Sequence, residues 1–365
     1  MKGFRQPPVS AMIVGTGMVI DFARIENEYI RDILAQPAAL AATVEGLRAT
    51  PELLRIAGGA QAGQFERIIL TGMGGSYHVL LPSHLELIAH GWNCFCVETS
   101  ELLRHMPRLL EGNTLVVALS QSGRSAELVR LGVQPRSGKL IAVTNTPGSP
   151  LFESADAVVL MRAGEEHSVS CKTSVASLAA LRWLSELLRG GDLGQTVKDL
   201  AQSAAAGQSY LQQWREHVAW LAGELEGVRD LFLLGRGPSL AAAGLGGCII
   251  KEAAHFHAEG MSAAAFRHGP MEMLSGETFV VIFAGGEDTA PLAYRLADDV
   301  RSIGARAAVV DYGADSAAFR LPEVPAGARP VVELLPPQMI SIALAALRGR
   351  DPGRFQNITK VTTVE

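Results

Sequence analysis

The pentapeptide Gly72-Met-Gly74-Gly75-Ser76 follows a short apolar run at 67–70 and leads into a long helical pattern. A similar turn, Gly235-Arg-Gly237-Pro238-Ser239, follows a second apolar run and also leads into a helical pattern. Both glycines and the serine recur at an offset of 163 residues (72 to 235). Farther along, 113–119 resembles 277–283 at an offset of 164 residues (113 to 277). Because these landmarks return in the same order, the sequence predicts a duplicated domain.

Each copy predicts alternating strands and helices. Short, continuous apolar runs such as 68–70, 115–119, 140–143 and 157–160 have the length of strands that are buried on both faces. Helical patterns lie between them. Alternation of this kind predicts two tandem α/β domains, each a parallel sheet flanked by helices. Ligands of such sheets bind beyond the carboxyl ends of the strands, so we expect the site in the loops that follow strands.

The composition excludes several classes of protein. Hydrophobic residues make up 48% of the 365 residues and charged residues 19%, so the chain can bury a large core and is not mainly disordered. A formal net charge of −5 argues against a nucleic-acid partner and against a polybasic membrane anchor. The sequence contains no uninterrupted run of about 20 apolar residues, which a membrane span would need. Four cysteines without a CxxC pair predict free thiols in a cytoplasmic protein, with Cys94 and Cys96 packed in the core.

The landmarks divide the chain into four regions. We expect an N-terminal extension with an entry helix at 1–47, a first domain at 48–195, a second domain at 196–350 and a C-terminal tail at 351–365. The apolar stretch 11–20 lacks the small-residue cleavage site of a signal peptide, and we interpret it as an irregular extension.

Several helices are expected outside the two sheets. They lie at 28–47, broken by Pro37 after Gln36, at 168–189 and 196–225 between the copies, and at 339–348. The tail has no helical period and by itself predicts a frayed terminus.

The loop Ser120-Gln-Ser122-Gly-Arg-Ser125 follows a predicted buried strand and opens a helix. Helix N-termini present unpaired N–H groups and a positive dipole end, which suit phosphate, and Gly123 lets the backbone approach a ligand closely. One serine is enough to cap a helix, whereas three serines and an amide exceed that need. The corresponding loop of the second copy, Ala284-Gly-Gly-Glu287, has no hydroxyl and carries a carboxylate. We therefore expect one phosphate site per chain, in the first copy.

The sequence argues against two kinds of cofactor site, one for a dinucleotide and one for a metal ion. The turn at 72–76 lacks the third glycine of a dinucleotide fingerprint, because Tyr77 stands there, and Ser76 can instead supply a hydroxyl to a sugar or its phosphate. His255 and His257 do not face each other on a helix, and no third ligand is evident, which argues against a metal site.

Acid–base candidates gather in the second copy. Glu252 lies about four helical turns beyond the second glycine turn, where partial burial would raise its pKa and make it a better base near neutral pH. A solvated carboxylate paired with lysine is the alternative. The glycines at 244, 246 and 247 predict open space beside it. His268, in a His-Gly-Pro turn, is either an acid–base group or a surface loop histidine.

Together these stretches resemble the sugar isomerase (SIS) family, closest to the isomerase half of the glutamine–fructose-6-phosphate aminotransferases. The resemblance runs from about residue 28 to 365. Its most specific pieces are Leu119–Gly123, Leu234–Gly237, Lys251-Glu252 with His257–Glu259, His268–Pro270 and the tail Asn357–Glu365.

The resemblance implies a role for each matching residue. Glu252 would move a proton between C1 and C2 of a sugar phosphate through an enediol-type intermediate. Lys360, in a tail that folds over the site, would contact the sugar carbonyl, and His268 of the neighbouring subunit would assist ring opening. The residues implied to bind the sugar phosphate are Gly75, Ser76, Ser120, Gln121, Ser122, Ser125 and Ser170. No metal or redox cofactor is implied.

The chain also departs from the family pattern. No segment matches a glutamine-hydrolysing domain, Ile249 and Ala265 stand where a lysine and a glutamate are usual, and the order of Lys172 and Thr173 is exchanged. These differences argue against glutamine-dependent synthesis. We predict a cytoplasmic homodimeric enzyme that isomerises a hexose 6-phosphate or deaminates an amino-sugar phosphate. The alternatives are a deglycase of fructosamine 6-phosphates and a non-catalytic phosphosugar sensor.

Overall fold

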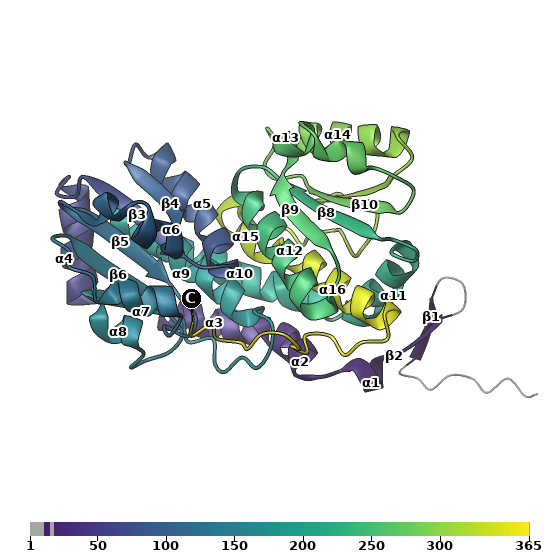
Figure 1. Cartoon of the computed structure of the whole chain (residues 1–365), viewed down its shortest axis with the longest axis horizontal. Coiled ribbons are helices and arrows are strands. Elements are labelled where there is room, and N and C mark those ends of the chain that lie inside the picture. Colours follow the sequence, from purple (N-terminus) through teal and green to yellow (C-terminus); the bar gives the residue numbers. More distant parts are fainter. Residues whose placement is uncertain (1–10, 15–17, 365) are drawn as a thin grey trace, which may run out of the picture.

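The computed structural model describes residues 11–14 and 18–364, and it contains two separate parallel sheets, one in each half of the molecule (Figure 1). The first sheet has the strand order β4-β3-β5-β6-β7, and the second has the order β11-β10-β8-β9. The strands are β3 (Arg67–Gly72), β4 (Cys94–Glu98), β5 (Thr114–Leu119), β6 (Lys139–Thr144), β7 (Ala157–Leu160), β8 (Asp230–Gly235), β9 (Ala258–Ser262), β10 (Thr278–Phe283) and β11 (Arg306–Val310). The predicted α/β architecture with one parallel sheet in each copy is confirmed.

The two glycine turns occupy the same place in both sheets. β3 lies between β4 and β5, and β8 lies between β9 and β10. The turns lead into α5 (Gly75–Ala89) and, through a short 3₁₀ turn, into α12 (Leu240–Ala254). The copies differ at one edge, because β7 has no counterpart in the second sheet, where a single bridge between Asp311 and Arg320 follows β11.

Helices cover both faces of each sheet, which explains why every residue of β5 and β10 is buried. On the first sheet, side chains from β3 and β5 pack on one face against α6, α7 and α8, and on the other face against α4, α5 and α9. These helices are α4 (Pro51–Gln61), α6 (Thr99–Arg104), α7 (Ala126–Gly132), α8 (Pro150–Ser154) and α9 (Lys172–Arg189). On the second sheet, α13 (Ala263–Phe266) and α14 (Ala290–Ser302) cover one face.

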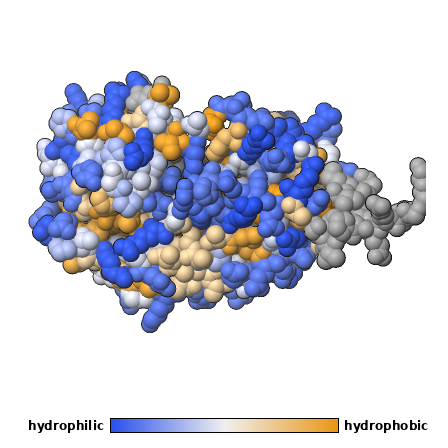
Figure 2. All heavy atoms as spheres, turned by 90° about the horizontal axis from the view of Figure 1, so that it is seen from below, coloured by the Kyte–Doolittle hydropathy of each residue, from blue (hydrophilic) through white to orange (hydrophobic). Residues whose placement is uncertain are grey.

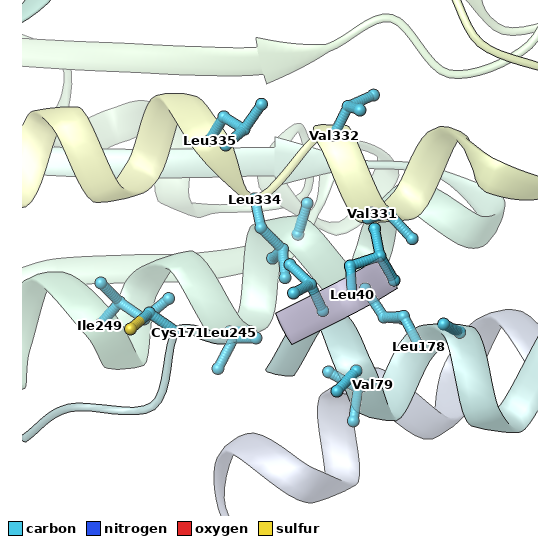
Figure 3. Packing of buried hydrophobic residues seen from close by; sticks show 14 of the residues in the cluster. Leu40, Val79, Cys171, Leu178, Leu245, Ile249, Val331, Val332, Leu334 and Leu335 are labelled. Atoms are coloured by element: carbon cyan, nitrogen blue, oxygen red, sulfur yellow. The ribbon is translucent and has the colours of Figure 1, made fainter. Parts of the chain in front are cut away.

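The two copies share one core. α9, α10 (Leu193–Leu211), α11 (Trp214–Glu224), α12 and α16 (Leu335–Leu347) contribute to a single buried apolar cluster that reaches both sheets. Figure 3 shows Leu40 of the entry helix and Leu178 of α9 beside Val331 and Leu334, which lie in and just after α15 (Arg329–Val332). The helix expected at 196–225 is interrupted between α10 and α11.

The N-terminal region differs from the prediction. Residues 11–14 and 18–21 form an antiparallel hairpin of β1 (Ala11–Val14) and β2 (Met18–Asp21), so the interpretation of 11–20 as irregular is wrong for the described residues. α1 (Phe22–Ile25) follows. The entry helix breaks as expected, into α2 (Glu28–Leu34) and α3 (Gln36–Gly46), with Pro37 in the first turn of α3.

The C-terminal tail crosses the molecule after α16 and runs past α2 to the first sheet (Figure 1). Figure 2 looks onto the underside, where hydrophilic residues cover most of the surface and apolar patches are scattered. In the described part of the chain, one helical stretch, Ala326–Leu347, is long and apolar enough to cross a membrane. Its most apolar window is 89% buried in the structure, as expected of a core helix.

Candidate active site

A cavity of about 330 Å³ lies beyond the carboxyl ends of β3 and β5, between the first copy, α12 and the C-terminal tail. Most of the site residues predicted from the sequence line it: Gly75, Ser76, Ser120, Gln121, Ser122, Ser125, Ser170, Glu252 and Lys360. His268 does not. A larger cavity of about 600 Å³ opens at the outer edge of the second sheet, beside β11, and none of the predicted site residues lines it. The chemistry-bearing residues of the chain therefore converge on the smaller cavity.

Hydrogen bonds to its own serines stabilise the hydroxyl-rich loop at 120–125. Ser120 Oγ accepts a hydrogen bond from Gly123 N at 3.1 Å, and Ser122 Oγ accepts one from Arg124 N at 3.2 Å. Gly123 has φ +61°, and a Cβ atom there would lie 2.0 Å from Ser149 Oγ, so only glycine fits. Ser125 precedes α7 but its side chain makes no capping hydrogen bond. The Ser125 hydroxyl is therefore available to a ligand at the positive end of the helix.

The first glycine turn brings Ser76 to the same cavity. Gly74 has φ +53°, which favours glycine, and α5 begins at the next residue. Gly72 packs closely against the turn, since a Cβ atom there would lie 3.1 Å from Ser76 Cβ. Ser76 thus lies in the first turn of α5 and faces the loop that follows β5.

Glu252 reaches the cavity from the last part of α12. Burial raises the pKa of Glu252, and nearby Glu166 raises it further, whereas the ammonium groups of Lys360 and Lys251 lower it. The raised pKa makes this carboxylate a stronger base than a solvent-exposed glutamate.

The glycines of α12 do not leave space beside Glu252, and that expectation is wrong. A Cβ atom on Gly244 would lie 2.3 Å from the ring of His78, and one on Gly247 would lie 2.9 Å from the backbone of Gly260. Gly246 is similarly close to Pro337. These glycines let α5, β9 and α16 pack tightly against α12 and so fix the helix that carries Glu252.

Lys360 is held in the cavity by Glu166, a residue that the sequence did not single out. Lys360 Nζ lies 3.0 Å from Glu166 Oε2 and also donates a hydrogen bond to Ser168 O. The side chain of Glu166 is fully buried, and it accepts hydrogen bonds from Cys171 N at 2.9 Å and from Thr173 N at 3.0 Å. A buried carboxylate with this many donors is a fixed counter-charge for the tail lysine. An adjacent pair of acidic residues, Glu165-Glu166, in the loop before α9 was the only signal in the sequence.

The exchanged order of Lys172 and Thr173 has a structural consequence. Thr173 Oγ1 donates a hydrogen bond to Glu166 Oε2 at 2.6 Å, beside the cavity. Lys172 instead forms an ion pair of 2.7 Å with Asp32 of α2, and both side chains are nearly buried. The exchange therefore leaves a hydroxyl on the cavity side and turns the lysine toward the entry helix.

The tail is anchored at both ends of its course over the site, so it is not a frayed terminus. Gly353 N donates to Ala253 O at 2.9 Å, next to Glu252 in the chain, and Asn27 Nδ2 donates to Pro352 O at 2.7 Å. Farther along, the backbone N–H of Ala126, at the start of α7, donates to Thr362 O at 3.2 Å. The tail thus connects α12 to the start of α7, next to the hydroxyl-rich loop at 120–125, and carries Lys360 between them.

Comparison with known proteins matches the SIS domain family twice, at residues 64–186 and 224–348. The chain belongs to the SIS domain family.

Among curated relatives of the two SIS domains, a glutamine–fructose-6-phosphate aminotransferase (isomerizing) from Pyrococcus horikoshii is 29% identical over 362 residues. That alignment covers 93% of this chain and 58% of the relative, so the chain spans little more than half of the relative's length. Among solved structures, the C-terminal domain of glucosamine-fructose-6-phosphate aminotransferase from Francisella tularensis matches with a TM-score of 0.77, at 20% identity over 90% of this chain and 98% of that one. A glucosamine-6-phosphate deaminase from Thermotoga maritima matches with a TM-score of 0.73, at 17% identity over 92% and 99%.

The histidines of the second SIS domain lie outside the cavity. His268 is exposed in the turn after α13, and its role across a subunit interface remains a prediction. His255 Nδ1 lies 3.0 Å from a guanidinium nitrogen of Arg350, and His257 Nδ1 lies 3.4 Å from a carboxylate oxygen of Asp230. Among residues 11–14 and 18–364, no group of three or more histidine, cysteine or acidic side chains is arranged to hold a metal ion.

The loop after β10 in the second SIS domain is closed on itself. Thr289 Oγ1 donates a hydrogen bond to Ala284 O at 2.7 Å, and Gly285 is buried beneath it with φ +71°. This loop lines no part of the 330 Å³ cavity. The difference between the two loops remains consistent with a phosphate site in the first domain alone.

Proposed function

We propose that this protein transfers a proton between C1 and C2 of a hexose 6-phosphate, either as an aldose–ketose isomerase or as an isomerising deaminase of the 2-amino sugar. The observation that carries the proposal is one cavity that holds a base with a raised pKa, a fixed ammonium group and a hydroxyl-rich loop at a helix N-terminus. Each of these groups matches one part of an open-chain sugar phosphate.

The phosphate would lie on the loop at 120–125 and the start of α7. The hydroxyls of Ser76 and Ser125 and the N–H groups of the helix terminus favour an anion there. With the phosphate so placed, the sugar chain would extend toward α12, where Glu252 and Lys360 face the same space.

The proton transfer itself follows from the residue types. Glu252 as a carboxylate would take the proton from C2 of the aldose, while the carbonyl oxygen on C1 gains a proton from solvent to give an enediol. Lys360 would stabilise the negative charge that develops on that oxygen. The protonated Glu252 then delivers its proton to C1, the hydroxyl on C2 releases its proton to solvent and becomes the carbonyl, and the ketose results. With an amine on C2, the same transfer gives an imine that water hydrolyses to the ketose and ammonia.

The two positions where the chain departs from the family pattern, Ile249 and Ala265, bear on the deglycase alternative. Ile249 lines the cavity but is buried, whereas Ala265 is exposed in α13 and does not line it. Only one of the two positions can therefore widen the site beyond C1. The similarity in fold to a glucosamine-6-phosphate deaminase is a reason to include the amino sugar in the first assay.

The test is a turnover panel with glucose 6-phosphate, fructose 6-phosphate, glucosamine 6-phosphate and a fructosamine 6-phosphate, followed by NMR in heavy water. We expect solvent deuterium at C1 or C2 with at least one hexose 6-phosphate. Glu252→Gln should lower turnover by about 10² to 10⁴, the range for losing a general base, while affinity stays within a few-fold.

Binding without product or exchange by the wild-type protein would support the sensor. Release of the amino acid from the fructosamine 6-phosphate alone would support the deglycase. Exchange by Glu252→Gln near the wild-type rate would show that Glu252 is not the base.

A further inference from the structure

The second SIS domain contains a buried charged cluster where the first has its cavity. Glu333 lies between α15 and α16, and its side chain is fully buried. Ser239 Oγ donates a hydrogen bond of 2.8 Å to Glu333 Oε1, and Arg329 Nε donates one of 3.1 Å to the same oxygen. Oε2 of Glu333 is buried and has no hydrogen-bond partner among the described residues.

The duplication shows what this cluster corresponds to. Ser239 and Ser76 occupy the same place in the two glycine turns, at an offset of 163 residues (76 to 239). Ser76 and Ser170 both line the open cavity of the first domain. Ser170 and Glu333 each stand two residues before the start of a long helix, α9 and α16 respectively.

The surroundings place the Glu333 carboxylate beyond the carboxyl ends of the strands, where a ligand of such a sheet would bind. Ser239 belongs to the turn after β8, and a Cβ atom on Gly285, in the loop after β10, would lie 3.6 Å from Ser239 Oγ. Arg329 also pairs with Asp311, directly after β11, at 2.8 Å. Three loops from the carboxyl edge of the second sheet therefore converge on one carboxylate.

We propose that the second SIS domain retains an anion site whose occupant is the side chain of Glu333, held by Ser239 and Arg329 in place of an external carboxylate or phosphate. This inference goes beyond the proposed function and does not depend on the reaction at the first site. Burial raises the pKa of Glu333 to about 7, whereas Arg329 and Ser239 lower it, so the carboxylate is charged at mildly alkaline pH. The Glu333 carboxylate occupies the position beside Ser239 that a ligand would take, so the chain supplies its own anion.

The experiment removes the internal anion and offers an external one. Glu333→Ala deletes the carboxylate and leaves space beside Ser239 and Arg329, whereas Glu333→Gln fills the same space without charge. Thermal unfolding of both variants and the wild type is followed at pH 8 in sodium acetate and in matched sodium chloride. We expect acetate to raise the midpoint of Glu333→Ala by about 2–4 °C more than that of the wild type, with no such excess for Glu333→Gln.

Equal shifts in all three proteins, or none in a folded Glu333→Ala, would overturn the proposal, since anion binding would then be confined to another site. Where Glu333→Ala fails to accumulate in cells, its refolding yield in acetate against chloride gives the same readout. Inorganic phosphate in place of acetate tests whether the site also admits a tetrahedral anion. Activity at the Glu252 site is measured separately, so failure of this proposal leaves the proposed function untouched.

Discussion

Removing the charge of Lys360 or of its partner Glu166 should shift the pH dependence of catalysis in opposite directions. Glu166 raises the pKa of Glu252, and Lys360 lowers it. Catalysis by a carboxylate base rises with pH through the pKa of that base. Glu166→Gln removes the negative neighbour, so the acid limb of the kcat/KM profile should move to lower pH. Lys360→Met removes the positive neighbour, so the limb should move to higher pH.

The size of the activity loss follows from the burial of the pair. Breaking a buried ion pair by neutralising one partner costs about 3–5 kcal/mol. Because the side chain of Lys360 keeps 22% of its exposure while Glu166 has none, we take the lower end, about 3 kcal/mol. If docking of the tail precedes proton transfer, kcat/KM of Glu166→Gln should fall by about 10², at tenfold for each 1.4 kcal/mol.

The assay is the pH dependence of turnover for whichever hexose 6-phosphate reacts, together with ¹³C NMR titration of labelled glutamate side chains, which does not need activity. Lys251→Met is the control, because Lys251 also lowers the pKa of Glu252 but, among the described residues, forms no hydrogen bond with the tail. Lys251→Met should move the acid limb of the kcat/KM profile to higher pH, without the hundredfold fall in kcat/KM expected for Glu166→Gln. Shifts in the same direction for Glu166→Gln and Lys360→Met, in folded proteins, would refute the electrostatic reasoning.

The fold could be predicted because its signals are local and repeated. The glycine turn at 72–76 and its counterpart at 235–239 each mark a strand end and a helix start, and their order alone implies two similar sheets. The cavity could also be located, because parallel strands place the loops that follow them at one edge. Ser76, Ser120 and Ser125 could be grouped without any knowledge of the tertiary structure.

The features that were missed depend on contacts between distant segments. Glu166 meets Lys360 across 194 residues, and no local pattern distinguishes it from a solvated loop carboxylate. The glycines of α12 predict open space beside Glu252 when only the sequence is considered. The packing of α5 and β9 decides whether a missing side chain leaves a void or admits a neighbour. No local pattern points to Glu333 either, since its partner Ser239 lies 94 residues away.

The hairpin at the N-terminus has a recognisable pattern in the sequence. Two short apolar runs flank a glycine-containing segment at 15–17, which is typical of a β-hairpin. The antiparallel pairing of β1 with β2 follows that pattern.

Three further predictions concern the loop and the assembly. Ser125→Ala should weaken binding of the sugar phosphate by about 1.5–3 kcal/mol, the range for hydrogen bonds to charged groups, with little change in stability because the hydroxyl caps nothing; calorimetric titration and thermal unfolding measure the two effects. Gly123→Ala should destabilise the chain by more than about 1 kcal/mol, because φ is +61° and the new Cβ would collide with Ser149, and denaturant unfolding checks this. The last prediction concerns shared sites. His268 is exposed and lines no part of the cavity within its own chain, so a catalytic role requires a second subunit. If two chains complete each other's sites, Glu252→Gln and His268→Ala subunits, each inactive alone, should form mixed dimers in which one site has both residues intact. Random exchange of equal amounts yields half the dimers mixed, so about a quarter of the wild-type activity should return. Exchange demonstrated by mass spectrometry without any recovery would confine the reaction to one chain and leave His268 a surface residue.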